Sequence, residues 1–301
     1  MESYMRVFIA LLAPLLWGTT YATVSAFFAG WSPFALAAWR ALPAGVLLFI
    51  IKPSLPKMSE IPSLLLVGFI NITLFFSLLF ESAMQLPSAL VGVGMITLPV
   101  IGLVVMAVVH KMKPSVIQLL SAMVLILCAS YLFLSSHADI SFASVGFLIA
   151  AMTVLIGGSV VTKHVMKKIY WWKLLTWKLI FGGIILLPIA YWHLYFSGNN
   201  YADPFSMTLP QWAALIWLIV GVTAVSYCAY VFSIPLITTS ELSFFGTFNP
   251  ILAMVIGATI MGEAFSPLQL CVMGMMILCN LVAQLYEKRH HQRTEQTVIS
   301  Y

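Results

Sequence analysis

Ten apolar stretches occupy almost the whole chain, and each is long enough to cross a lipid bilayer. Because about 20 apolar helical residues span roughly 30 Å of hydrocarbon, we expect ten membrane-spanning helices. They cover residues 6–28, 33–51, 63–82, 88–110, 115–134, 143–162, 173–194, 211–233, 239–261 and 267–286. The composition agrees, because 62% of the residues are hydrophobic and 8% are charged, a ratio at which a water-soluble globule would aggregate. The first stretch has no small-residue cleavage site, so we expect a retained span and not a signal peptide.

The sequence contains an internal repeat. Residues 81–118 and 232–269 each predict an apolar helix, a Ser-containing turn and an apolar helix with a mid-span proline, and Pro99 corresponds to Pro250 at the same offset that relates Gln118 to Gln269. We therefore divide the chain into a first repeat over residues 6–134, a second over 143–286, and a polar, mobile tail at 287–301. Because each repeat crosses five times, the second is inverted, as in many secondary transporters. The sequence predicts an all-α integral membrane protein in which two inverted five-helix repeats surround a central cavity.

The basic residues indicate how the spans are oriented. Lys and Arg accumulate on the cytoplasmic side of a membrane protein, and in this chain they fall on alternate loops: Arg6, Lys52, Lys57, Lys111, Lys113, Lys163, Lys167, Lys168, Lys173, Lys288, Arg289 and Arg293. The opposite loops contain none. Both termini are therefore predicted to be cytoplasmic, and the net charge of +5 reflects membrane orientation and not nucleic-acid binding.

Two basic residues lie inside predicted spans, each directly after a tryptophan. Trp39-Arg40 in span 2 corresponds to Trp177-Lys178 in span 7. An ionised side chain at such a depth costs roughly 2.5–3.5 kcal/mol, so Arg40 needs a partner. It either receives a substrate carboxylate or is satisfied by helix-end carbonyls or a neighbouring acid. For Lys178 we expect snorkelling to the cytoplasmic interface beside Lys173.

The order of several short motifs resembles the drug/metabolite transporter superfamily, specifically its EamA-like ten-span exporters. The resemblance covers roughly residues 8–286 and rests on Leu16-Trp17-Gly18, Ser32-Pro33 ahead of Trp39-Arg40, the duplicated prolines, and Met261-Gly262-Glu263 with Ser266 and Gln269. It implies two five-helix repeats around a central cavity and the outward movement of small metabolites such as amino acids or drugs. Met112 stands in the first repeat where the second has Glu263, so we expect Glu263 to be structural.

Two prolines and two acids are candidates for the transport cycle. Pro99 and Pro250 free the carbonyls of Met95 and Gly246, which must find another partner in a membrane; the prolines are either conformational hinges that line the cavity or simple packing kinks. Glu81 is the candidate for proton coupling. For Glu241 the preferred reading is a helix N-terminal cap.

The candidate substrate-binding residues lie deep in the spans that bound the expected cavity. Aromatic rings there are suited to an apolar or aromatic ligand, although core packing is an alternative reading for each ring, and two asparagines add polar contacts. The set comprises Trp17, Tyr21, Arg40, Phe75, Tyr227, Tyr230 and Phe248, with Asn71 and Asn249.

Together these features predict a secondary transporter of the bacterial inner (plasma) membrane that exports a small metabolite, most readily an amino acid, by alternating access. Efflux of hydrophobic drug-like compounds, a channel and a membrane-embedded lipid-modifying enzyme are the alternatives. No Gly-rich loop for ATP is present, the histidines and cysteines form no catalytic or metal-binding pattern, and we expect no cofactor. The expected partners are the substrate and the lipid bilayer, and the protein is a monomer or a homodimer.

Overall fold

The computed structural model describes residues 3–109, 111, 114–136, 140–197, 206–233 and 245–299, and within these ranges every regular element is a helix. The elements are α1 (Ser3–Gly18), α2 (Thr20–Phe28), α3 (Pro33–Ile51), α4 (Ile61–Gly68), η1 (Phe69–Leu74), α5 (Phe75–Gln85), α6 (Ser88–Ile96), α7 (Leu98–Val109), α8 (Val116–Leu134), α9 (Phe142–Met166), α10 (Trp171–Ser197), α11 (Leu209–Ile216), η3 (Trp217–Val225), α12 (Ser226–Ser233), α14 (Phe248–Thr259) and α15 (Pro267–Ile299).

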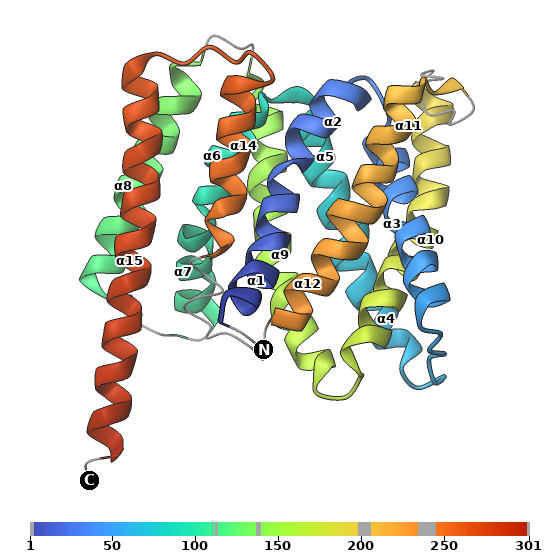
Figure 1. Ribbon diagram of the computed structural model, residues 1–301, viewed down its shortest axis with the longest axis horizontal. Coiled ribbons are helices and arrows are strands. Elements are labelled where there is room, and N and C mark those ends of the chain that lie inside the picture. The colour runs from blue at the N-terminus through green and yellow to red at the C-terminus, as the bar shows by residue number, and fades with distance from the viewer. Residues whose placement is uncertain are drawn as a thin grey trace.

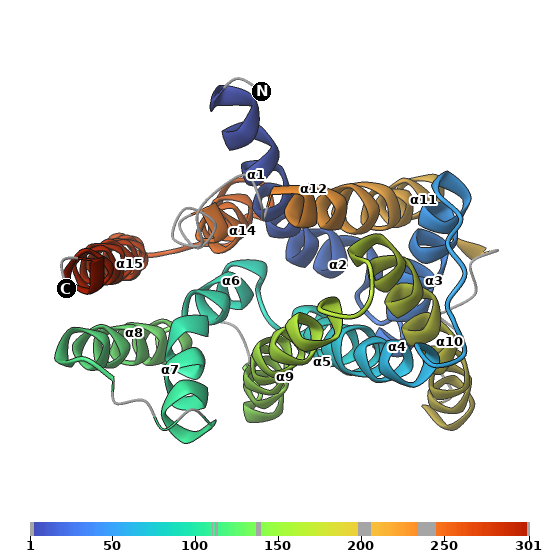
Figure 2. The same ribbon diagram turned by 90° about the horizontal axis from the view of Figure 1, so that it is seen from below.

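The described residues form nine helical spans that are long and apolar enough to cross a membrane, and the shorter apolar helix α14 lies in the predicted span 9. This confirms the all-α fold with two five-helix repeats. The helices run roughly side by side, and both ends of the chain lie on the same side of the bundle (Figure 1). Helices α8 and α15 form one edge of the bundle (Figure 2), where Leu125 and Leu132 pack with Met273 and Met276.

Three of the expected spans are interrupted by a single non-helical residue. Span 1 breaks at Thr19 and span 4 at Thr97, and in both places the threonine hydroxyl donates a 2.7 Å hydrogen bond to a carbonyl three residues earlier. Thr247 interrupts the described part of span 9. The second and third breaks lie two residues before Pro99 and three before Pro250, where a proline cannot supply a helical N–H.

The third span of each repeat contains a π-helix. Element η1 joins α4 to α5, and η3 joins α11 to α12. They end just before Phe75 and Ser226, which are related by the same offset as Pro99 and Pro250. Because π-helices are rare and frequently occur at functional sites, this shared irregularity directs attention to the centre of the bundle between spans 3 and 8.

The central helices α3 and α10 approach each other closely. A Cβ atom at Gly45 would lie 2.8 Å from Ile180 Cγ1 and 2.9 Å from Ile180 N, so only glycine fits. Small residues at such crossings are the usual means of bringing two membrane helices together. The crossing sets how α10 is rotated about its axis and which of its side chains face the bundle interior.

Helix α15 continues through Ile299, so the helix of span 10 extends without a break into the polar segment from residue 287 that we expected to be a mobile tail. Glu241 and Met112 lie outside the described residues.

Candidate functional site

Arg40 on α3 lies in the core of the bundle with 2% of its surface exposed. Its Nε donates a 2.7 Å hydrogen bond to Thr223 Oγ1, and its guanidinium carbon lies 4.4 Å and 5.4 Å from the ring centroids of Phe76 and Phe80. Its Nη1 is buried without a hydrogen-bond partner. In the described part of the chain no carboxylate lies within ion-pair distance of Arg40. The aromatic faces attract the cation, but they leave its charge unneutralised.

Among the described residues, the side chain that accepts a hydrogen bond from Arg40 is Thr223, on the π-helix η3. Thr223 Oγ1 donates its own proton to the carbonyl of Leu218, 2.7 Å away. The five-residue separation between these two is the spacing of a π-turn. The widened turn therefore orients the Thr223 oxygen as an acceptor for Arg40 and explains why irregular backbone occurs here.

Lys178 on α10 also faces the centre, so the snorkelling prediction is wrong. It is 8% exposed, and its Nζ lies 4.7 Å from the ring centroid of Tyr227. The neighbouring Trp177 instead faces the segment that follows α3, since its Nε1 donates a 2.6 Å hydrogen bond to the carbonyl of Ser54. Consecutive helical residues point in directions about 100° apart, so this orientation of Trp177 turns Lys178 inward.

Aromatic rings from α1 and α12 pack together beside Lys178, which contacts the Tyr227 ring. The ring centroid of Trp17 lies 5.4 Å from those of both Tyr227 and Tyr230. Tyr21 on α2 is buried, shares a hydrogen bond with the side chain of Asn249, and lies within electrostatic range of Arg40. Five of the predicted binding residues are thus assembled with Arg40 in one place.

We call this set the central cluster: Trp17, Tyr21, Arg40, Lys178, Tyr227, Tyr230 and Asn249. Within this cluster three buried atoms lack a hydrogen-bond partner, namely Arg40 Nη1, the Trp17 Nε1 donor and the Asn249 Oδ1 acceptor, which are three of the seven such side-chain atoms among the described residues. Leaving a buried polar group unsatisfied costs about 1–3 kcal/mol, and native proteins tolerate few such groups. Their concentration in one cluster that also contains two cations indicates a site for a polar ligand.

Two further candidates lie at the margin of this cluster. Phe75 is buried, with its ring centroid 5.7 Å from that of Phe76, and so belongs to the layer behind Arg40. Phe248 is half-buried and precedes Asn249 at the start of α14. Their contact with substrate stays a prediction.

Asn71 and Glu81 are placed elsewhere. The Asn71 amide lies between helices and donates to the carbonyl of Val67 and to Thr162 Oγ1, each at 3.1 Å. Glu81 accepts a 2.5 Å hydrogen bond from Gln85. The structure does not bring either residue to the central cluster, so binding by Asn71 and proton coupling by Glu81 remain predictions without geometric support.

Glu263 has the structural role expected of it. Its Oε1 accepts hydrogen bonds from the Ser88 N–H and hydroxyl, both at 2.7 Å, and its Oε2 accepts from the Ala89 N–H at 3.1 Å. The carboxylate therefore caps the N-terminus of α6, where the helix dipole favours a negative charge. Pro250 packs on the same helix, because a Cβ at Gly92 would lie 3.1 Å from its carbonyl oxygen. Hinge motion at Pro99 and Pro250 stays a prediction.

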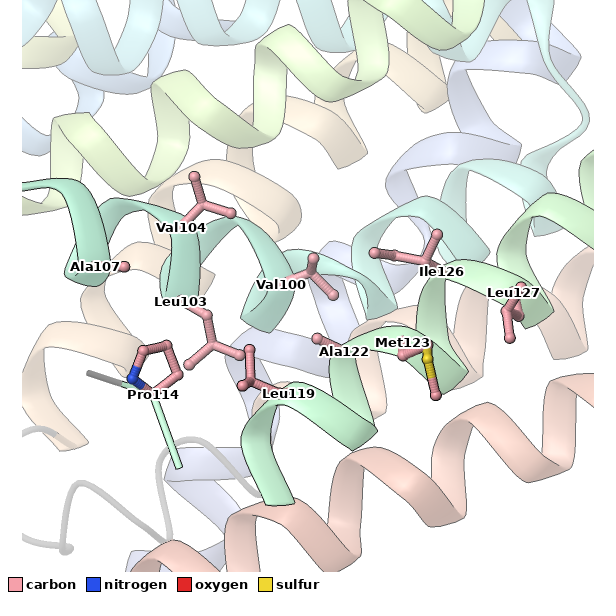
Figure 3. Close-up of a pocket in the computed structure, with 10 residues that line it drawn as sticks. All are labelled: Val100, Leu103, Val104, Ala107, Pro114, Leu119, Ala122, Met123, Ile126 and Leu127. Carbon is pink, nitrogen blue, oxygen red and sulfur yellow. The ribbon is translucent and has the colours of Figure 1, made fainter. Parts of the chain in front are cut away.

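A groove of about 410 Å³ lies between α7 and α8, away from the central cluster (Figure 3). Its lining residues are all apolar and include Val100, Leu103, Leu119 and Met123. Such a surface offers no hydrogen bond to a polar metabolite. The groove fits a lipid acyl chain and is not our candidate site.

Comparisons with known proteins concern the family and the fold of the chain. A family model described as the EamA-like transporter family matches residues 5–136 and 142–283. A protein of Dickeya dadantii (strain 3937) named Protein PecM is 25% identical over 271 residues, which are 87% of this chain and 86% of that protein. A solved crystal structure shares the fold with a TM-score of 0.64 at 14% identity, covering 96% of this chain and 99% of the other.

Proposed function

Since the chain belongs to the EamA-like transporter family, and is therefore a membrane transporter of small molecules and not an enzyme, we propose that it exports amino acids by alternating access. The two matched regions correspond to the two repeats. Their inverted relation provides two related conformations around one site. The central cluster lies between helices of both repeats and is our candidate for that site.

The proposal rests on the burial of Arg40 and on the partners that its guanidinium lacks. It is buried, holds an unpartnered N–H, and has no acid at ion-pair distance among the described residues. A cation kept in this state suits a ligand that brings its own carboxylate, because guanidinium and carboxylate form strong, geometrically matched hydrogen bonds. We propose that the substrate carboxylate binds at Arg40 Nη1.

The remaining contacts suit the other parts of an amino acid. Asn249 Oδ1 is a free acceptor for the ammonium group, and Trp17 Nε1 is a further donor for the carboxylate. The rings of Trp17, Tyr227 and Tyr230 form a wall for the side chain. A purely apolar drug would leave all three polar atoms unsatisfied, at a cost of about 1–3 kcal/mol each.

The arrangement of charge supports a proposal for the orientation of the protein in the membrane. Lys57 and Lys173 lie at one end of the bundle, joined through Glu60, and an excess of basic residues favours the cytoplasmic side. We propose that this end and both termini face the cytoplasm of a bacterium, with the protein in its inner membrane. Export from that side is our proposal for the direction.

The test is exchange in liposomes. Purified protein is reconstituted, and the exchange of a panel of labelled amino acids is measured with and without a pH gradient, for the wild type, for Arg40→Ala and for a control, Lys163→Met, that changes an exposed lysine. We expect saturable exchange that is lost in Arg40→Ala and retained in Lys163→Met. No exchange of any amino acid would overturn the proposal, and continued transport of uncharged aromatic amines by Arg40→Ala would favour drug efflux. Conductance without saturation would indicate a channel.

A further inference from the structure

We propose that the substrate carries two anionic groups, one bound at Arg40 and the other at Lys178, which places it among the acidic amino acids. This inference rests on the proposed function, since it names the substrate class of the same site. The juxtaposition that suggests it is a second buried cation, Lys178, beside the Tyr227 ring, which also lies within electrostatic range of Arg40.

The two cations share Tyr227 as a neighbour. Lys178 Nζ lies 4.7 Å from the centroid of the Tyr227 ring, and the tyrosine lies within electrostatic range of Arg40. Arg40 belongs to the second span of the first repeat and Lys178 to the second span of the second repeat, each directly after a tryptophan. The two repeats thus each contribute one buried cation within electrostatic reach of Tyr227.

Protein carboxylates do not neutralise this pair in the described part of the chain. Of the acids there whose side chains are described, Glu60 pairs with Lys173, Glu81 bonds to Gln85, and Glu263 caps α6. Removing each ion from water costs several kcal/mol unless an opposite charge is supplied. A neutral amino acid brings a carboxylate and an ammonium together, so it leaves the charge of the site unchanged.

A second carboxylate on the substrate changes this balance. In an acidic amino acid the α-carboxylate binds Arg40 Nη1, the ammonium binds Asn249 Oδ1, and the side-chain carboxylate reaches Lys178. A dicarboxylate without an amine neutralises both cations but leaves Asn249 Oδ1 without a donor, and that atom is buried and unpartnered. The three contacts together select glutamate or aspartate over both neutral amino acids and simple dicarboxylates.

Counterflow with defined solutes tests the inference. Liposomes containing the protein are loaded with unlabelled glutamate, and uptake of labelled glutamate, leucine and succinate is compared for the wild type, Lys178→Met, Lys178→Arg and the exposed control Lys163→Met. Because a hydrogen bond to a charged group contributes about 1.5–3 kcal/mol, the wild type and Lys163→Met should favour glutamate over leucine by at least about tenfold. Lys178→Met should lose this preference and Lys178→Arg should keep it. Size-exclusion chromatography verifies that each variant is folded.

The outcomes separate the two proposals. Leucine carried as well as glutamate, with the ratio unchanged in Lys178→Met, overturns the two-anion inference while the amino-acid proposal stands. Succinate carried as well as glutamate overturns the assignment of the ammonium to Asn249. A wild type that exchanges no amino acid overturns the proposed function itself.

Discussion

Glu263, half-buried in the connection between α14 and α15, and Arg40, buried in the core, are both charged side chains of an apolar bundle, but their surroundings differ. The Glu263 carboxylate accepts three hydrogen bonds from the start of α6, whereas Arg40 has one hydrogen bond to a hydroxyl, two aromatic faces and an unpartnered Nη1. A satisfied charge holds two helices together, and removing it leaves buried donors unpaired. A charge with free bonding capacity contributes little to folding and remains available to a ligand.

Asn71 and Asn249 show the same difference in hydrogen bonding between two residues of one type. The Asn71 amide reaches across to α9 and donates to Thr162. Asn249 shares a hydrogen bond with Tyr21 but keeps Oδ1 without a partner. Hydrogen-bond saturation therefore separates polar groups that stabilise the bundle from those that form the site, and substitutions at matched positions can test that separation.

The largest expected effect is on stability, from Glu263→Ala. Removing the carboxylate leaves the Ser88 and Ala89 N–H groups at the α6 N-terminus without an acceptor, which should cost about 2–3 kcal/mol and lower the unfolding temperature in detergent. Glu263→Gln keeps one acceptor oxygen and should cost less. Transport per folded molecule should be unchanged in both variants. If transport is lost while stability is retained, Glu263 belongs with the site and the contrast fails.

The next largest effect is expected on transport, from a substitution at Trp17, and Trp177 provides the matched comparison. Trp17 Nε1 has no partner, whereas Trp177 Nε1 donates to the Ser54 carbonyl at 2.6 Å. Trp17→Phe should therefore leave the unfolding temperature unchanged and reduce transport about five- to tenfold, as expected for one hydrogen bond of about 1–1.5 kcal/mol made only to substrate. Trp177→Phe should instead lower stability by about 1 kcal/mol. Transport per folded molecule should change less than in Trp17→Phe, because the close crossing of α3 and α10 at Gly45 still keeps Lys178 inward. The reverse pattern would remove Trp17 from the binding site.

A smaller effect is expected at the duplicated prolines. Pro99 and Pro250 follow the breaks at Thr97 and Thr247 closely, and if these breaks flex during the cycle, Pro99→Ala or Pro250→Ala should slow turnover about two- to fivefold, equivalent to about 0.5–1 kcal/mol of barrier. Substrate affinity should change less. Equal losses of substrate affinity and stability would show that the prolines, like Glu263, stabilise the bundle and do not serve as hinges.

The sequence predicted the fold well because span length and hydropathy are local properties. The ten apolar stretches, the duplicated prolines and the matched Trp-cation pairs are all visible without any knowledge of packing. The same patterns also identified Arg40, Trp17 and Tyr227, which the structure brings together. Each of these signals depends only on residue type and on position along a span.

The errors concern properties that depend on how helices are rotated and what they face. The inward direction of Lys178 follows from the crossing of α3 and α10 at Gly45 and from the hydrogen bond of Trp177, neither of which is visible in hydropathy. The π-turn at Thr223 shifts the register of α12, and the partner of Asn71 is 91 residues away in the chain. The duplicated Trp-cation pair could have predicted that Lys178 faces the interior, because the symmetry of the repeats favours equal positions for Arg40 and Lys178.

The smallest expected effect lies at the surface, where the ion pair of Glu60 and Lys173 spans 3.0 Å and water competes with the charges. The Lys57 backbone N–H, which donates to Glu60 Oε2 at 2.7 Å, and after it the Lys173 ammonium lower the pKa of the Glu60 carboxyl below its ordinary value of 4.5. A lowered pKa means that the ionised form stabilises the fold at neutral pH and that this stability is lost as the pH falls below about 4.5. Glu60→Gln should remove that portion of the pH dependence and cost about 0.2–1 kcal/mol at pH 7, measured as the unfolding temperature across a pH series. A loss as large as that of Glu263→Ala would show that this end of the bundle, like the α6 N-terminus, depends on a fully satisfied carboxylate.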